Sequence, residues 1–424
     1  MKETYIKFDN LHLFGIPKCV NLRSVLSLKA ADAESNPIRL YNSLGGLYYY
    51  FHDSLIKERH YQSIKKEGSH FLLFYGIYNL RKDHQKTFLG FADRFIDADV
   101  FYASFLEKKK ITIGRFFKCL CFFLIWMAQM LLHRISLYEA CNALPFVLLC
   151  YDTNKNVKQL LTRKYRFVVV YYDASPDENC FVQMCKEKRI TSMTLQHGIF
   201  ARKSVVHTIT DTAFELSSSI SDYYLAWNEY TKDEAIKVGL KPERVIVLGA
   251  PKYINTKEPE LPYKADNNIF GVILNNSAFD THNRHLIDMA NQIYKITGKR
   301  YILRYHPQMK GDEYRNLYGD GFLKKDDNAH TIGEYAKEVS FTIISSSSVF
   351  VDLLLLKHPT YRLKVFEEDT YSSVDFNSFS TVEELLEVMK SKTVDNKAFL
   401  YLCNSYNTFD NYRSFFDNVL LDIE

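Results

Sequence analysis

Short apolar runs that each end at a small or polar residue recur through the last two thirds of the chain. The runs at 167–172 and 191–195 flank a segment that begins Asp-Ala-Ser-Pro-Asp at Asp173, where serine or aspartate can cap a helix and proline suits its first turn. Runs of four to six apolar residues are typical of buried parallel strands. We therefore expect a strand–helix–strand unit over 167–195, with its helix ending near Lys188.

The alternation of apolar runs and helix-like segments continues toward the C-terminal end. Residues 256–268 interrupt it with two prolines and few apolar side chains, which is typical of a linker. Strands that alternate with helices on both sides of a linker predict two doubly wound α/β domains, one over 1–255 and one over 269–424. Further strands are expected at 71–75, 223–227, 245–248, 269–274, 301–304 and 341–344, and helices at 231–238, 284–297, 332–338, 349–357, 381–390 and 396–406.

Composition and charge are those of a globular protein. The 424 residues suffice for two domains of about 200 residues each, and 47% of them are hydrophobic and 25% charged. The net charge of +4 is too small to indicate a nucleic-acid partner. The eight cysteines are scattered without CxxC pairs, and the chain does not start like a secretory signal. We therefore expect a cytoplasmic protein in a reducing compartment.

Basic residues gather between Phe101 and Ala140, where six lysines and arginines accompany two glutamates. Within this window, residues 116–132 are the only candidate for a membrane segment. Lys118 and Gln129 interrupt them, so the uninterrupted apolar stretch is far shorter than the roughly 20 residues that a spanning helix needs. Two interpretations stay open: a helix buried in the protein or against another subunit, and a helix in the interface of an anionic leaflet, which would make the protein peripheral at the inner face of the cell membrane.

Four consecutive serines follow the apolar run at 341–344 and precede a segment with a helical pattern. At such a strand-to-helix turn, hydroxyl groups, backbone N–H groups and the positive helix end can converge on an anion, for which phosphate is the obvious ligand. The alternative is that one serine caps the helix and the others are merely tolerated. The four residues are Ser345, Ser346, Ser347 and Ser348.

His306 ends the strand that precedes the serine run in sequence order. Pro307 forces the chain out of the strand, so that His306 projects at the same edge of the sheet. An imidazole there can donate a hydrogen bond to a phosphate oxygen, and when protonated it offsets charge on a departing nucleotide. Arg304, two residues earlier, is a further candidate for the phosphate site, unless it pairs with a carboxylate instead.

His197 ends the strand at 191–195 and is the first candidate for a general base. Gly198 beside it permits close approach of a ligand, and an imidazole has a pKa near working pH. A histidine hydrogen-bonded beneath the loop is the alternative. Asp173, which ends another strand of the first domain, is the second candidate base, although it can equally cap the following helix.

In their order and spacing, these motifs resemble a set of bacterial cell-surface glycopolymer transferases. Gln196-His197-Gly198, the strand end at 249–252, Arg304-Tyr305-His306-Pro307 and the serine run carry the resemblance, which covers about 167–363. The set includes teichoic-acid glycerophosphotransferases, capsule polysaccharide transferases and polysialyltransferase-like enzymes. The resemblance implies the GT-B arrangement, in which two Rossmann-like domains face each other across a cleft.

The resemblance also implies roles for the motifs. His197 matches the base of the glycerophosphotransferases, and His306 and the serines match residues that hold the nucleotide phosphate. It implies no cofactor, only a nucleotide-activated donor, CMP- or CDP-linked, and a saccharide or lipid-linked glycan as acceptor, for capsule, O-antigen or other surface polysaccharide. One departure is that the first domain lacks the acidic-acidic-Gly motif of bacterial sialyltransferases. Gly319-Asp320-Gly321 follows His306 and so lies in the second domain.

Two other kinds of protein fit the same features. A nucleotide-sugar epimerase shares the two-domain shape but needs no acceptor. A non-catalytic factor of polysaccharide assembly or export would use the basic window at 101–140 rather than the histidines.

Metal-binding patterns are weak, and we expect a metal-independent enzyme. Asp97-Ala98-Asp99 has the DxD form of metal-dependent glycosyltransferases, but such a triplet is common by chance. His282 and His285 have the spacing of ligands without a partner cluster of cysteines or carboxylates.

Overall fold

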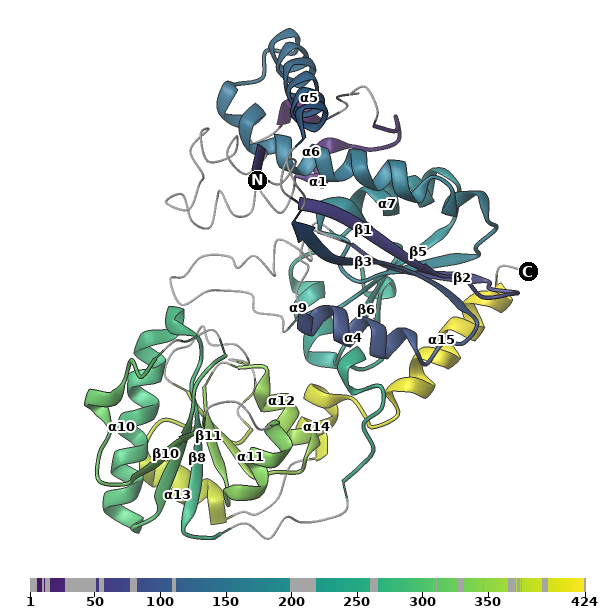
Figure 1. The fold of residues 1–424 in the computed structure, drawn as a ribbon. Helices are drawn as coiled ribbons and strands as arrows, with labels where there is room; N and C mark the ends of the chain where they lie inside the picture. Colours follow the sequence, from purple (N-terminus) through teal and green to yellow (C-terminus); the bar gives the residue numbers. More distant parts are fainter. Residues whose placement is uncertain are drawn as a thin grey trace.

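The computed structural model contains two sheets of largely parallel strands, and helices cover each sheet (Figure 1). It describes residues 6–9, 11, 16–26, 51–52, 57–76, 82–108, 112–198, 219–259, 266–307, 309, 311–326, 331–345, 347–364, 371, 374, 376–390 and 396–422.

Seven strands of the described part form the first sheet. Their spatial order is β1 (Lys57–Ile64), β3 (Ala98–Lys108), β2 (Phe71–Tyr75), β4 (Phe167–Val170), β5 (Thr191–Leu195), β6 (Tyr223–Ala226) and β7 (Val245–Val247). All neighbours are parallel except β1, which pairs with β3 in the antiparallel sense. The parallel strands thus run 2-1-3-4-5-6 in chain order, and the order reverses between β2 and β4.

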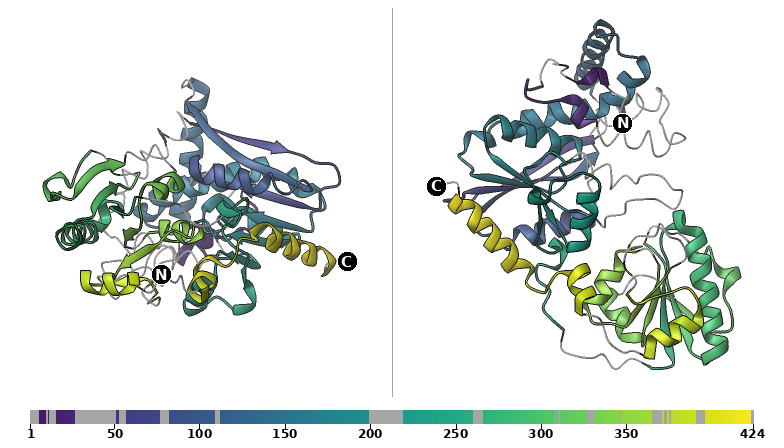
Figure 2. Two further views of the ribbon diagram at one scale, coloured as in Figure 1. Left: turned by 90° about the horizontal axis from the view of Figure 1, so that it is seen from below. Right: turned by 180° about the vertical axis from the view of Figure 1, so that it is seen from behind.

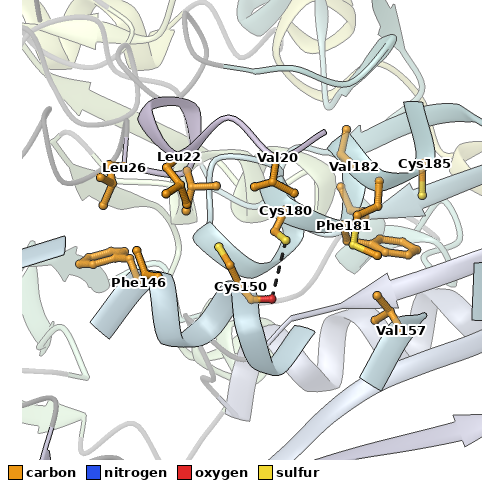
Figure 3. Packing of buried hydrophobic residues seen from close by; sticks show 14 of the residues in the cluster. Val20, Leu22, Leu26, Phe146, Cys150, Val157, Cys180, Phe181, Val182 and Cys185 are labelled. Atoms are coloured by element: carbon orange, nitrogen blue, oxygen red, sulfur yellow. Dashed lines mark hydrogen bonds between the residues drawn. The ribbon is translucent and has the colours of Figure 1, made fainter. Parts of the chain in front are cut away.

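Alternating side chains of the first sheet enter two separate cores. Leu72 and Phe74 of β2 face α6 and α7, whereas Phe71 and Leu73 face α4. Figure 3 shows part of the first of these cores, where Cys150 of α6 lies near Cys180 and Phe181 of α7. Apolar side chains on both faces explain why these strands are continuous apolar runs. The helices are α1 (Leu22–Val25), α4 (Lys82–Ala92), α5 (Ile113–Leu132), α6 (Leu137–Val157), α7 (Pro176–Glu187) and α9 (Glu229–Lys237).

Six strands of the described part form the second sheet, all parallel to their neighbours. Their spatial order is β10 (Phe322–Asp326), β9 (Arg300–Arg304), β8 (Ile269–Ile273), β11 (Thr342–Ile344), β12 (Thr360–Leu363) and β13 (Ser378–Phe379). This is the order 3-2-1-4-5-6 of the Rossmann fold. Helices α10 (Asp280–Thr297) and α13 (Val382–Lys390) pack on one face, and α11 (Ile332–Glu338), α12 (Val349–Leu355) and α14 (Asn396–Cys403) on the other.

The last helix, α15 (Thr408–Asp422), returns to the first sheet (Figures 1 and 2). The Phe416 ring lies 5.5 Å from that of Phe71 and 5.2 Å from that of Phe167. Tyr412 donates a hydrogen bond to the carbonyl of Gly249 at 3.1 Å. The sequence placed all of 269–424 in the second domain, but this terminal helix covers the first.

The two predicted doubly wound sheets and each predicted strand are confirmed, with ends that shift by a few residues. The described part also contains 3-10 turns at Ile6–Phe8, Leu160–Thr162, Pro242–Arg244, Pro251–Tyr253, Ser277–Phe279 and Arg315–Leu317. No helix of the described ranges combines the length and the hydrophobicity needed to cross a bilayer.

Candidate functional site

Each sheet has one point at which the strand order reverses: between β2 and β4 in the first, and between β8 and β11 in the second. At such a switch point the connections leave the carboxyl edge toward opposite faces of the sheet. The crevice between them is where open α/β sheets bind ligands. The sequence-predicted residues fall at or beside these two points, which we call the first and the second switch point.

A small pocket opens at the first switch point, with room for about one water molecule. Two aromatic strand ends, one histidine of α4 and the start of α7 surround it together with the tip of β5. Its lining residues are Tyr75, Gly76, His84, Tyr171, Tyr172, Ser175, Glu178 and His197.

Neighbouring residues hold the His197 ring in this pocket. It contacts Tyr172, with ring centroids 4.0 Å apart, and lies 6.0 Å from the ring of His84. Buried Gln196 fixes the backbone at the tip: its side chain donates to the carbonyl of Gly198 at 2.7 Å and accepts from the N–H of Trp227 at 2.7 Å. His197 is partly exposed, and these contacts fix the strand end that carries it.

Glu178, in the first turn of α7, joins the two strand ends across the switch point. One carboxyl oxygen accepts the N–H of Gly76 at 2.7 Å, and the other accepts the N–H of Tyr172. Burial raises the pKa of the carboxyl group well above its ordinary value, and the neighbouring carboxylate of Asp177 adds to the rise. Glu178 thus sets the backbone beneath the Tyr172 ring on which His197 packs.

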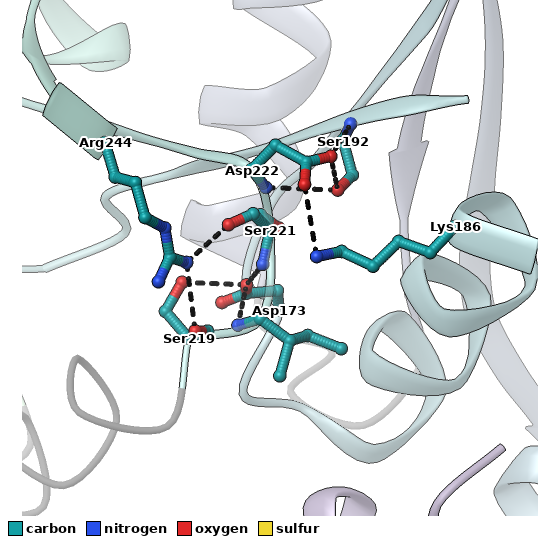
Figure 4. A network of polar contacts seen from close by, with 8 residues as sticks. Asp173, Lys186, Ser192, Ser219, Ser221, Asp222 and Arg244 are labelled. Carbon is teal, nitrogen blue, oxygen red and sulfur yellow. Dashed lines mark hydrogen bonds and ion pairs between the residues drawn. The ribbon is translucent and has the colours of Figure 1, made fainter. Parts of the chain in front are cut away.

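Asp173 lies outside the pocket lining. Its Oδ2 atom accepts three hydrogen bonds, from the hydroxyl of Ser219 at 2.9 Å and from the N–H groups of Ile220 and Ser221 at 2.9 and 2.8 Å (Figure 4). Arg244 donates to the carbonyl of Ser219 at 3.1 Å. The buried carboxylate therefore organises the chain at 219–221, ahead of β6.

At the second switch point, the ends of β8 and β11 are joined by side chains. Asn275 donates to the hydroxyl of Ser345, and both residues are buried. Ser347 and Ser348 lie half-buried at the start of α12, and the hydroxyl of Ser347 accepts the N–H of Val349 at 3.3 Å. Ser346 lies outside the described residues. Ser345 is thus buried at the sheet edge, and Ser347 and Ser348 lie partly exposed beside it.

His306 follows β9, the strand next to β8, and is half-buried. Arg304 on the same strand forms an ion pair with Asp326 of β10, and its guanidinium lies 5.4 Å from the centre of the Tyr335 ring. Of the two options open for Arg304, the structure shows the pair with a carboxylate. Parallel register places the ends of β9, β8 and β11 side by side, so His306, Asn275 and the serines share one edge.

No protein-family model and no curated protein matches the sequence. Solved structures similar to the chain include the UDP-GlcNAc 2-epimerase of Methanocaldococcus jannaschii, at 12% identity and a TM-score of 0.49, over 82% of this chain and 99% of that one. Another is the lipopolysaccharide outer core galactosyltransferase WaaB, at 12% and 0.49, over 83% and 99%. The wall teichoic acid polymerase TagF gives 17% and 0.34, over 64% and 85%. Similarity this distant does not assign an activity, which has to be argued from the residues.

The two aspartates of the DxD triplet are engaged in different contacts. Asp97 accepts two hydrogen bonds of 2.9 Å from Arg413 of α15. Asp99 is buried; burial opposes its ionisation, but hydrogen bonds from Tyr165 and the Lys66 N–H, together with Arg163, hold the pKa of its carboxyl group below the ordinary value. Both carboxylates are therefore engaged in hydrogen bonds and ion pairs within the protein.

The paired histidines of α10 do not converge: His282 is buried, and His285 is exposed. In the described part of the chain, no group of three or more His, Cys, Asp or Glu side chains has the geometry of a metal site.

Sequence reasoning missed three residues of these sites: His84, Glu178 and Asn275. His84 belongs to a helix in the part of the chain with the weakest pattern. Glu178 follows the predicted helix start at Ser175 and Pro176, so the sequence could have placed it in the first turn of α7. Asn275 directly follows an expected strand, and that position was its only signal.

Proposed function

We propose that the chain is a glycosyltransferase or glycerophosphotransferase-like enzyme of surface-polysaccharide assembly. The donor, a cytidine nucleotide derivative, would bind at the second switch point, and the acceptor hydroxyl at the first. One observation carries this proposal: each sheet has its own switch point. His197 lies beside the first, and His306 and the serines lie beside the second. A transfer between two ligands needs two such sites.

In this proposal, His197 removes the proton from the acceptor hydroxyl. Its partly exposed ring is fixed by Tyr172 and by the Gln196 anchor, as a general base requires. Asp173 is the weaker candidate, because Oδ2 already accepts three hydrogen bonds and the residue does not line the pocket. The pocket is about the size of one water molecule, so it can receive the acceptor hydroxyl but not the rest of a sugar ring.

At the second switch point, His306, Ser347 and Ser348 would donate hydrogen bonds to the phosphate of the leaving nucleotide. Fixed donors of this kind stabilise developing negative charge without rearrangement. Ser345 and Arg304 would act as positioning residues, through Asn275 and Asp326 respectively. On this account the reaction needs no metal ion, so full activity in the presence of a chelator is expected.

Thermal shift with CMP, CDP, UDP and GDP tests the donor site. We expect cytidine nucleotides to raise the melting temperature, since a ligand at a hundredfold excess over Kd stabilises the folded state by about 2.7 kcal/mol. His306→Ala should weaken the nucleotide about tenfold or more by removing a hydrogen bond to a charged group. His285→Ala, an exposed histidine of α10, is the matched control and should bind normally.

The same assay can contradict the proposal. Stabilisation by UDP or GDP but not by cytidine nucleotides would refute the donor class. No response to any nucleotide would refute the donor site itself. Consumption of a nucleotide sugar without an acceptor would instead indicate an epimerase.

A further inference from the structure

Helix α5 exposes an apolar face along its whole length. Ile113, Phe117, Leu124 and Leu131 follow one another at spacings of four and seven residues, which places them on one stripe. Large apolar side chains on or beside this stripe are between 44% and 81% exposed. They are Ile113, Phe116, Phe117, Leu124, Ile125, Leu131 and Leu132, and Leu137 at the start of α6 is exposed as well.

The opposite face of α5 is fixed to the protein. Trp126 and Met130 are buried, and the indole N–H of Trp126 donates to the carbonyl of Ala140 in α6 at 3.0 Å. The rotation of the helix is thereby set, and the exposed stripe cannot turn inward. Contiguous apolar patches beyond a few hundred Å² are rare on monomeric soluble proteins, so this stripe calls for a partner.

The polar residues of α5 identify the partner. Lys118 and Gln129 lie on one edge of the helix, three turns apart, and exposed His133 continues that edge. The helix contains no aspartate or glutamate. Exposed Arg134 follows it, and its carbonyl accepts a hydrogen bond from Lys7 at 2.6 Å. In the sequence, Lys108, Lys109 and Lys110 precede the helix. An apolar stripe on a helix without acidic residues, flanked by an excess of basic residues, complements an anionic lipid surface.

We propose that α5 lies flat in the interface of an anionic bilayer, with the stripe in the acyl region and Lys118 at the headgroups. The 20-residue helix is about 30 Å long and stands at the end of the first domain remote from the second (Figures 1 and 2). The protein would be anchored by a surface of the first domain, without a spanning segment. This inference concerns the location of the chain and does not depend on the transferase reaction.

Co-sedimentation of the full chain with vesicles of phosphatidylglycerol and phosphatidylcholine tests it. We expect binding to the mixed vesicles, weak binding to pure phosphatidylcholine, and release by salt. The double variant Leu124→Glu/Ile125→Glu should bind about tenfold more weakly or worse, because two apolar side chains no longer enter the bilayer. Lys118→Gln should weaken binding about fivefold.

Matched controls separate insertion from a general effect of surface charge. Ile296→Glu on α10 and Leu400→Glu on α14 replace side chains of similar exposure elsewhere and should leave vesicle binding unchanged. Phe117→Trp should shift its fluorescence to the blue with anionic vesicles and be quenched by brominated lipid. All variants concern exposed positions, and a thermal melt of each checks that it is folded.

Three results would overturn the proposal. The wild-type protein could fail to bind anionic vesicles. The double variant could bind as well as the wild type. Light scattering could show a dimer that Leu124→Glu/Ile125→Glu dissociates while vesicles are not bound, in which case a second copy of the chain covers α5. Because binding is measured without substrates, none of these results bears on the donor site, and failure of the nucleotide assay would not bear on α5.

Discussion

Gly76 directly follows β2 at the first switch point, and replacing it with alanine tests how tightly this site is packed. An ideal Cβ atom there would lie 2.4 Å from Oδ2 and 2.7 Å from Cγ of Asp177, and 2.8 Å from Cγ of Glu178. Both acidic side chains are buried, so neither can swing into solvent. The N–H of Gly76 also donates to Glu178, so a displaced strand end loses that bond.

The expected cost follows from these two effects. Overpacking of a filled site costs about 1–3 kcal/mol, and a buried group that loses its hydrogen-bond partner costs about 1–3 kcal/mol more. We therefore expect Gly76→Ala to lower the free energy of unfolding of the first domain by about 2–6 kcal/mol. With a urea dependence of about 1–3 kcal/mol per M, the unfolding midpoint should fall by about 1 M or more.

Urea unfolding followed by tryptophan fluorescence measures this effect in one domain. Trp126 and Trp227 are the two tryptophans of the chain, and both belong to the first domain. Gly90→Ala is the matched control: it lies inside α4 with open space at its Cβ position, and we expect a gain of up to about 1 kcal/mol. Nucleotide binding at the second switch point should be unaffected by Gly76→Ala. An unchanged midpoint for this variant would refute the tight junction of β2 and α7.

Three further predictions concern stability and turnover. Phe416→Ala should lower the free energy of unfolding by about 3–5 kcal/mol in the same assay, because the ring is buried between aromatic rings of β2 and β4. Burial lowers the pKa of His358 from 6.5 to about 4, so only the unfolded chain gains this proton as pH falls from 6.5 to 4. Stability should therefore decline over that window by up to about 3 kcal/mol in calorimetry, and His358→Gln should show less decline. Once an acceptor substrate is known, His197→Ala should reduce kcat by about 10²–10⁴. Asp173→Asn keeps an oxygen that can accept from the three donors, so the folded variant should retain most of its turnover. The reverse result would identify Asp173 as the base.

The predictability of the fold differs between the middle of each sheet and its edges. β4 and β8 are buried on both faces, so their sequences are uninterrupted apolar runs. The edge strand β1 has the sequence Lys-Glu-Arg-His-Tyr-Gln-Ser-Ile, because an edge strand carries charges that discourage further pairing. Its partner β3 mixes polar and aromatic residues, and neither strand was predicted. The apolar pattern thus finds strands with apolar side chains, including the partly buried edge strand β7, and misses strands that carry charges.

The candidate site divides in the same way. His197, His306 and Ser345 were predicted because each lies within two residues of the end of an apolar strand, and the parallel topology brings the ends of neighbouring strands together. The role of Gly76 depends on Glu178, which lies 102 residues further along the chain. No local pattern links the two, since their contact exists only after β2 and β4 have paired.

The position of α15 shows what a local pattern leaves open about a domain. Its aromatic residues Phe409, Tyr412 and Phe416 have helical spacing, which predicts an apolar face but not the sheet that the face covers. The competing surface on the second sheet is already covered by α10 and α13 on one side and by α11, α12 and α14 on the other. The first sheet has α4 on the corresponding side, and α15 completes its core there. Tyr412 donates a hydrogen bond to the carbonyl of Gly249, next to the point where the chain leaves the first sheet, so α15 packs beside the start of the linker. The domain that α15 completes is therefore decided by which core was left incomplete, and not by where the linker lies in the sequence.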